Sequence, residues 1–109
     1  MNDCIFCKIQ SDKSNWLEEN DKFFAIYDIQ PIEKGHALII SKRHVENVFG
    51  FDDEEAKAML DLLKKIKSRL DKEFKPIAYN IGINSGKEAG QIIFHAHIHL
   101  IPRYYNKNK

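Results

Sequence analysis

The sequence has no long apolar run and no excess of either charge, and these absences exclude several kinds of protein. No segment approaches the ~20 apolar residues that a transmembrane helix needs. Seventeen Lys and Arg residues stand against sixteen Asp and Glu residues, which gives a net charge of +1. Because so small a net charge creates no global field, we expect neither a nucleic acid nor a membrane as a partner.

Cysteine is scarce, and the first residues lack the features of a secretory signal. Only two cysteines occur, Cys4 and Cys7. The first residues carry neither the charged start nor the apolar run of a signal peptide. We therefore expect a cytoplasmic protein with reduced thiols, since disulfides persist mainly in oxidising compartments. The 109 residues, 43% of them hydrophobic, predict one globular domain over residues 1–109.

Histidine, by contrast, is concentrated in one stretch. Three of the five histidines, His95, His97 and His99, alternate with apolar residues. Alternation is the period of a β-strand, whose successive side chains point to opposite faces. We expect a strand over residues 94–101 with the imidazoles on one face and the apolar side chains in the core. An ordinary polar strand face is the alternative, although Thr, Lys or Ser would serve it equally well.

A metal site is a second interpretation of the histidine row. Histidines two residues apart on a strand can share a zinc ion. His95 and His99 would lie roughly 13 Å apart at a rise of ~3.3 Å per residue, whereas a zinc–nitrogen bond is only ~2 Å long. One ion cannot bind all three, so we expect the row to divide between a structural and a chemical task.

The pair Cys4-x-x-Cys7 indicates half of a zinc site. A thioredoxin-like redox pair needs a strand before it, and only three residues precede Cys4. A structural zinc needs two further ligands, for which His44 and His95 are the economical candidates. Two cysteines without a metal are the alternative.

Apolar patterning predicts five strands and one long helix. Strands are expected over residues 16–19, 23–27, 36–41, 77–84 and 94–101. A capping box at Asp52 and Glu55 begins a helix that ends before Pro76. The helix carries one apolar stripe, formed by Ala56, Met59, Leu60, Leu63, Ile66 and Leu70. The predicted fold class is α+β, with an antiparallel sheet covered by the helix.

The histidine row resembles the signature of the histidine triad (HIT) family, His-φ-His-φ-His-φ-φ, in which φ is apolar. Here it reads His95-Ala-His97-Ile-His99-Leu-Ile, and the Pro102-Arg103 that follows is similar to the bacterial, Hint-like members. Further landmarks match in order along nearly the whole chain: Cys4-x-x-Cys7, Tyr27-Asp28-Ile29, Gly35-His36, Ser41-Lys-Arg-His44, Asn84 and Gly90-Gln91. The resemblance implies a homodimer and a HIT-like five-stranded antiparallel sheet with one long helix and a short N-terminal helix or turn.

The same resemblance implies a nucleotide-binding hydrolase that cleaves purine nucleoside phosphoramidates or related nucleotidyl conjugates through a covalent nucleotidyl-histidine. His97 would be the nucleophile, because a neutral imidazole can attack phosphorus without an added base. His99 would stabilise the phosphate, with His95 and His36 as the supporting members. From the residues alone, the favoured interpretation of His36 is a structural histidine in the core or at its edge. No divalent cation would be needed for the chemistry.

Substrate-binding residues are also implied by the resemblance. Asp28 would accept hydrogen bonds from the ribose diol, Phe24 and Ile26 would flank the base, and Asn84 and Gln91 would donate to the scissile phosphate. On sequence alone, Asp28 is a turn residue and the two apolar side chains belong to a core.

Zinc-bearing relatives imply a structural ion held by Cys4, Cys7, His44 and His95. One position departs from the pattern, because Ile92 stands where many eukaryotic relatives have a serine after the glutamine. The missing hydroxyl leaves the leaving-group preference open. A dinucleoside polyphosphate hydrolase, a nucleotide-binding module with little turnover and a zinc-organised interaction domain remain alternatives.

Overall fold

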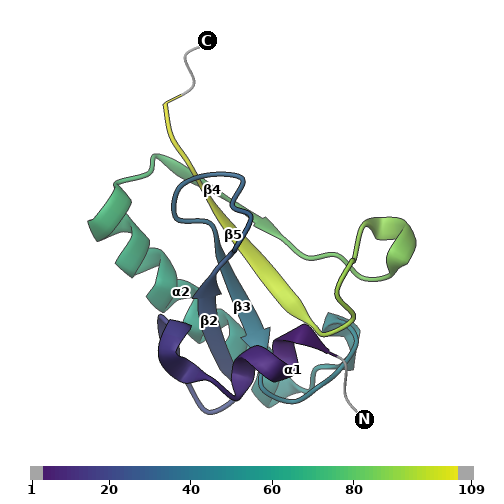
Figure 1. Ribbon diagram of the computed structural model, residues 1–109. Coiled ribbons are helices and arrows are strands. Elements are labelled where there is room, and N and C mark those ends of the chain that lie inside the picture. Colours follow the sequence, from purple (N-terminus) through teal and green to yellow (C-terminus); the bar gives the residue numbers. More distant parts are fainter. Residues whose placement is uncertain (1–3, 106–109) are drawn as a thin grey trace.

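The computed structural model describes residues 4–105, so the expected domain over 1–109 extends beyond the described part at both ends. Its main elements, in order, are α1 (Ile5–Gln10), β1 (Glu18–Glu19), β2 (Phe23–Tyr27), β3 (Ala37–Ser41), α2 (Asp53–Phe74), β4 (Ala78–Gly82) and β5 (His97–Arg103) (Figure 1). Short 3-10 turns occupy Lys13–Asn15, Val48–Gly50 and Lys87–Ala89. The predicted α+β class, with its long helix and short N-terminal helix, is confirmed.

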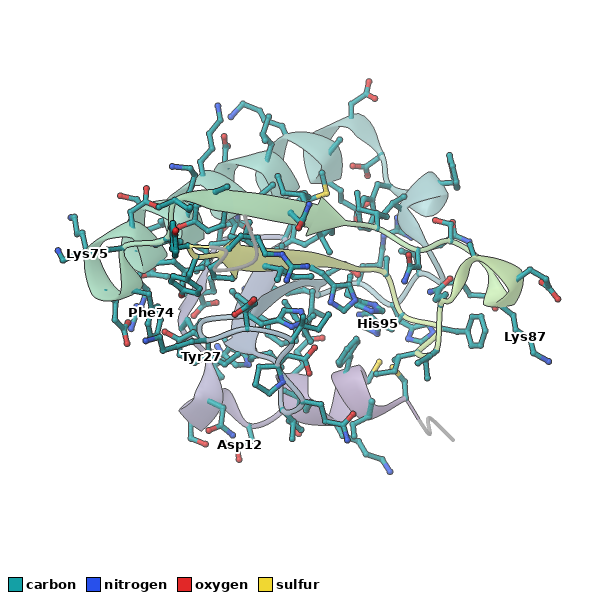
Figure 2. All side chains as sticks on the ribbon, turned by 90° about the horizontal axis from the view of Figure 1, so that it is seen from above. Asp12, Tyr27, Phe74, Lys75, Lys87 and His95 are labelled. Atoms are coloured by element: carbon teal, nitrogen blue, oxygen red, sulfur yellow. The ribbon has the colours of Figure 1, made fainter. Side chains whose placement is uncertain are left out.

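One antiparallel sheet with the strand order β1-β2-β3-β5-β4 forms the middle of the molecule. β5 lies between β3 and β4, with Ile98 opposite Ile39 and Leu100 opposite Ile81. The long helix α2 covers one face and the short helix α1 covers the other, as Figure 2 shows with α2 above the sheet and α1 below it. The strand that carries the histidines is therefore covered on both faces.

Two apolar cores result from the alternation of side chains along the strands. On the α2 side, Phe23 and Ala25 of β2 pack with the helix, whereas Phe24 and Ile26 of the same strand pack towards α1. Within β5 the predicted alternation is confirmed, since Ile98 and Leu100 are almost completely buried in the core on the α2 side, whereas Phe94, before the strand, is 44% exposed. Burying one such side chain stabilises the fold by about 1.5–3 kcal/mol, so these contacts hold β5 in register.

The ends of α2 follow the sequence prediction, but its apolar face differs in part. The Asp52 side chain accepts from the Glu55 amide at 2.8 Å, and Glu55 accepts from the Asp52 amide at 3.0 Å, so the capping box is confirmed. The prediction that Leu60 belongs to the buried stripe is wrong, because it is 46% exposed and the unpredicted Leu62 packs against the sheet. Ala56 is also exposed.

No helix within residues 4–105 is long and apolar enough to cross a membrane.

Four strands begin later than predicted: β3 and β4 by one residue, β1 by two and β5 by three, and β4 also ends at Gly82 instead of residue 84. β1 contains only Glu18–Glu19, and the Trp16 ring stacks on Phe24 with the centroids 4.5 Å apart. β5 begins at His97, because the amide of Ala96 donates to the Val45 carbonyl at 2.7 Å instead of continuing a ladder. The prediction that His95 lies in the same strand as the other two histidines is therefore wrong.

A buried carboxylate fastens the segment between β3 and α2. Glu55 is only 3% exposed, and its oxygens accept from Nε and Nη2 of Arg43 at 2.9 and 2.7 Å. Arg43 also donates to the Gly50 carbonyl at 2.8 Å. This fork holds the loop that carries His44, because planar guanidinium–carboxylate pairing is geometrically specific.

We predict that Glu55→Gln destabilises the protein at pH 7 by about 1 kcal/mol, which is less than a fully buried charged hydrogen bond contributes, because solvent screens the half-exposed Arg43. The hydrogen bond from Arg43 lowers the pKa of Glu55 below its ordinary value of 4.5. The carboxylate's contribution is therefore present above that value and is lost as the pH falls through the lowered pKa. Urea unfolding should show the difference from wild type at pH 7 and a smaller one at pH 3. Asp61→Asn, in an exposed pair with Lys57, is the control and should change stability little at either pH.

Candidate active site

A cavity of about 330 Å³ opens between α1 and the sheet, at the N-terminal end of β5. Its apolar wall consists of Ile5, Phe6, Ile9, Ile26, Ile29, Leu38, Ile92 and Ile93. Its polar lining consists of Asp28, Gln30, Asn84, His97 and His99. A largely apolar cavity with a few convergent polar groups is the usual form of a small-molecule site.

The tautomer of His97 is set by a backbone carbonyl. Nδ1 of His97 lies 2.7 Å from the carbonyl oxygen of His95, which can only accept, so the ring proton is on Nδ1. Burial lowers the pKa of His97 below 6.5, against smaller opposing effects of this hydrogen bond and of Asp28. The edge of the Phe6 ring packs against the imidazole at a centroid distance of 5.0 Å. His97 is thus a neutral ring whose unprotonated nitrogen is Nε2.

His36 and His99 lie side by side next to the cavity. Nε2 of His36 is 3.0 Å from Nδ1 of His99, and Asp28 Oδ2 is 3.5 Å from the same His36 nitrogen. His36 itself is buried and does not line the cavity, whereas Asp28 and His99 do. Burial is the main cause that lowers the pKa of both rings. The structure therefore brings together Asp28, His36 and His99, for which the family resemblance implied roles near the ribose and the phosphate.

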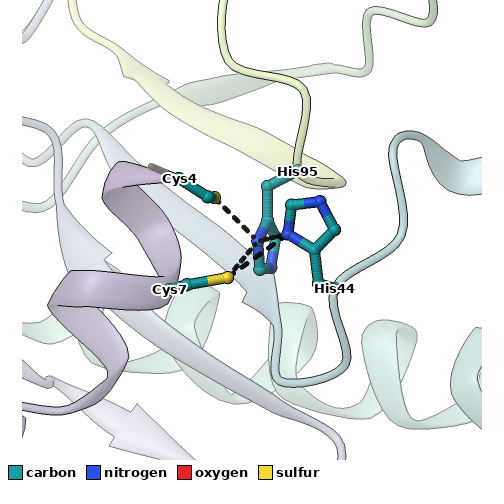
Figure 3. A group of neighbouring side chains, drawn as sticks. All are labelled: Cys4, Cys7, His44 and His95. Carbon is teal, nitrogen blue, oxygen red and sulfur yellow. Dashed lines mark hydrogen bonds between the residues drawn. The ribbon is translucent and has the colours of Figure 1, made fainter. Parts of the chain in front are cut away.

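Four side chains from three parts of the chain form a second cluster, shown in Figure 3. Nδ1 of His95 is 3.2 Å from Cys4 Sγ, 3.5 Å from Cys7 Sγ and 3.1 Å from Nδ1 of His44. Cys7 Sγ also lies 3.2 Å from the His44 nitrogen. All four ligand atoms lie within 4.8 Å of one another. Two thiols and two imidazoles at this spacing fit a tetrahedral zinc ion.

The second nitrogen of His95 supports this interpretation. His95 is fully buried, and its Nε2 donates to the Ser41 carbonyl at 2.7 Å. Nδ1 is therefore unprotonated and directed at the two sulfur atoms and His44. A backbone carbonyl that fixes the ring in this way is the usual outer partner of a metal-binding histidine. The donor set thus fits zinc.

Comparison with known proteins agrees with the histidine row and the fold. Residues 10–106 match the family model described as HIT domain. The chain belongs to the HIT family. It is 45% identical over 103 residues to Protein hit of Bacillus subtilis (strain 168). The matched region covers 93% of this chain and 71% of that protein. It is also 38% identical over 102 residues to the adenosine 5'-monophosphoramidase hnt1 of Schizosaccharomyces pombe, covering 92% of this chain and 74% of the relative.

Solved structures of HIT proteins have the same fold. The crystal structure of a HIT family protein from Bacillus anthracis superposes with a TM-score of 0.90 at 37% sequence identity. The superposition covers 96% of this chain and 76% of the other. The resemblance read from the histidine row is thus confirmed at the level of both sequence and fold.

Two predicted substrate residues of this HIT protein do not line the cavity. Gln91 is buried, and its amide donates to the carbonyls of Glu46 and Ile93 while its oxygen accepts from the Gly86 amide at 2.8 Å. Phe24 is fully buried beneath Trp16. Their predicted contacts with a phosphate and a base stay predictions.

The sequence reasoning missed the part of the cavity that α1 contributes. Ile5, Phe6 and Ile9 form its apolar wall on that side, and Phe6 also touches the rings of His95 and His97. The spacing of these apolar residues, with positions 5 and 9 one helical turn apart, is the signal of a helix face that packs on another layer.

Proposed function

We propose that this HIT protein hydrolyses purine nucleoside phosphoramidates or related nucleotidyl conjugates through a nucleotidyl-His97 intermediate. The observation that carries the proposal is the hydrogen bond from Nδ1 of His97 to the His95 carbonyl, which leaves Nε2 as a free lone pair beside the cavity. The S. pombe relative is named for action on an adenosine 5'-monophosphoramidate, which supports the same substrate class.

The cavity lining suggests how a nucleotide would bind. The purine would contact the apolar wall at Ile26 and Leu38, with α1 on the other side. The Asp28 carboxylate at the rim would accept from the ribose hydroxyls. Asn84, whose Nδ2 is 3.5 Å from the Gly90 carbonyl, would turn this amide towards the phosphate. Gln91 would act indirectly, by holding the 86–93 loop to the Glu46 carbonyl.

The reaction would proceed in two displacements at phosphorus. The Nε2 lone pair of His97 attacks the α-phosphorus, the phosphorus–amine bond breaks, and its electron pair leaves on the amine nitrogen with a proton from His99 or water. Water then attacks the phosphorus and gives a proton to His99 or to solvent, the bond to Nε2 breaks, and the nucleoside monophosphate leaves while His97 regains its neutral form. His99 would stabilise the non-bridging oxygens in both steps. We propose that no divalent cation takes part.

A zinc ion at Cys4, Cys7, His44 and His95 would have a structural task in this scheme. It would hold α1 against the start of β5, and with it the His95 carbonyl that orients His97. The ion itself would take no part in either displacement.

The homodimer implied by the family is also proposed for this chain. Within residues 4–105, β4 is an edge strand that pairs with β5 alone. Ile77 and Ile81 on or beside it are 72% and 56% exposed, an arrangement that soluble proteins usually cover. A partner strand paired to β4 would extend the sheet and bury both side chains, with the Arg103–Tyr105 segment near the partner's site. A cytoplasmic location stays a prediction.

We predict that His97→Asn binds AMP but loses turnover of adenosine 5'-phosphoramidate by several powers of ten, because no attacking nitrogen remains. Wild-type protein quenched during turnover of a radiolabelled substrate should carry acid-labile label, and His97→Asn should not. His99→Ala should lose less, since the nucleophile is retained. Diadenosine polyphosphates tested in parallel should turn over more slowly. A variant with near wild-type turnover would show that the histidine row is structural.

The double variant Cys4→Ser, Cys7→Ser should lose zinc and unfold at a markedly lower temperature, because structural zinc contributes directly to folding. Turnover per folded molecule should fall far less than in His97→Asn. Metal analysis of gently purified wild-type protein should find one zinc per chain. Metal-free wild-type protein of unchanged stability would contradict the assignment.

Sedimentation at micromolar concentration should show a dimer. Ile81→Lys should give a monomer, because it places a charge on the apolar edge that a second sheet would cover. Lys87→Glu, in an exposed loop away from β4, serves as the control and should leave the dimer intact. A monomeric wild-type protein would remove this proposal.

A further inference from the structure

A short chain of hydrogen bonds leads from a backbone amide to the histidine that faces the cavity. The amide of Ile32 donates to Nδ1 of His36 at 3.1 Å. Nε2 of His36 then meets Nδ1 of His99 at 3.0 Å. His36 is 2% exposed, so water does not compete for either ring nitrogen. The direction of the first bond is certain, because a backbone amide can only donate.

We propose that the backbone amide of Ile32 sets the tautomer of His99 through His36, so that His99 presents Nε2–H as a donor to the cavity. Because Nδ1 of His36 accepts, the single proton of the neutral ring is on Nε2. That proton points at Nδ1 of His99, which must accept it and carry its own proton on the far nitrogen. The value of this donor to a bound phosphate rests on the proposed function, but the tautomers do not.

Any other placement of the protons on His36 and His99 either makes two N–H donors face each other or leaves one ring without a proton. A proton on Nδ1 of His36 would face the Ile32 amide, and a proton on Nδ1 of His99 would face Nε2–H of His36. Leaving such donors unpaired in a buried site costs about 1–3 kcal/mol each. Asp28 at 3.5 Å is a second acceptor for the His36 proton, and it favours the same tautomer.

The charge state of the two rings is consistent with this chain. Burial is the main cause that lowers the pKa of His36, where Asp28 acts in the opposite sense and Arg103 in the same sense. Burial likewise lowers the pKa of His99, with His97 and His36 in the same sense and Asp28 opposed. Both rings are therefore neutral near pH 7.5, the condition under which a tautomer exists.

A metal ion is the competing occupant of this cluster. The ligand atoms of Asp28, His36 and His99 lie within 4.8 Å of one another, which is a spacing that an ion can use. Coordination through Nε2 of His36 would require that ring to lose both protons, because Nδ1 already accepts from Ile32. A neutral proton chain avoids this cost.

The loop that presents Ile32 is fastened on its outer side. The Tyr104 hydroxyl donates to the Lys34 carbonyl at 2.6 Å. Gly35 has a φ of +87°, and a Cβ there would lie 2.9 Å from the Phe74 ring, so this turn is restricted to glycine. The His36 amide donates to the Glu33 carbonyl at 3.1 Å. These contacts hold the Ile32 amide in line with the buried ring.

The test is nitrogen-15 NMR of the histidine rings in the full chain without nucleotide, at pH 7.5. Long-range proton–nitrogen correlations distinguish a protonated from an unprotonated ring nitrogen, and variants that each lack one histidine assign the signals. We expect His36 and His99 both to carry the proton on Nε2. A proton on Nδ1 of either ring would overturn the proposal. So would a metal requirement for these signals, tested by adding Zn²⁺ or a chelator.

Two variants test the cause. Ile32→Pro removes the donating amide, and Ile32→Ala keeps the amide while removing the side chain. We expect an Nδ1–H population at His36 and His99 in the first and none in the second. His36→Leu, which removes the link, should also allow Nδ1–H at His99 and keeps the test decisive if Ile32→Pro does not fold. If His99 stays entirely Nε2–H in His36→Leu, the proposal is wrong.

Failure of the tautomer proposal differs from failure of the proposed function. The NMR signals are read without substrate, so they hold or fail independently of hydrolysis. Expected tautomers in a protein that does not turn over adenosine 5'-phosphoramidate would remove the function and retain the proton chain. Turnover of adenosine 5'-phosphoramidate together with Nδ1–H at His99 would retain the function and remove the proton chain.

Discussion

The 2.7 Å hydrogen bond between Nδ1 of His97 and the His95 carbonyl is the interaction on which the site depends. It requires the peptide after His95 to leave the strand ladder, which the bond from the Ala96 amide to Val45 secures. It also requires His95 to be immobile, and the Ser41 carbonyl and the Cys4–Cys7 cluster supply that restraint. His95 therefore belongs to both sites. Its ring lies in the cluster with Cys4, Cys7 and His44, and its carbonyl oxygen orients His97.

Burial between two layers makes the histidines suitable for this arrangement. An imidazole in water near neutral pH is a mixture of charged and neutral forms. The sheet, α1 and the loop before β3 remove most of the water, so the rings of His36, His97 and His99 all have a lowered pKa. In the neutral state each ring has one donor and one acceptor. Backbone groups then set the direction of the His36 and His97 rings, and His36 in turn sets that of His99.

Much of the fold was predictable because local patterns and tertiary contacts agree. The capping box at Asp52 and Glu55 is a local interaction, and it begins α2 as predicted. Alternation located the buried members of β5, since a pleated strand has two faces. Prediction was wrong for Leu60 and for the start of β5, where the choice depends on which surface the element meets. A pattern of one element does not specify its partner layer.

By itself, the sequence determined the family, the fold class and the residues that gather at the two clusters, because a histidine row and a Cys-x-x-Cys pair are local and chemically specific. Only the tertiary structure decided what each ring does. It separated His95 from the strand, directed the amide of Gln91 to backbone carbonyls and built the apolar wall from α1. The physical reason is that the position of a proton on a neutral imidazole depends on the groups facing its two nitrogens. For His36 and His99, those groups come from segments more than sixty residues apart.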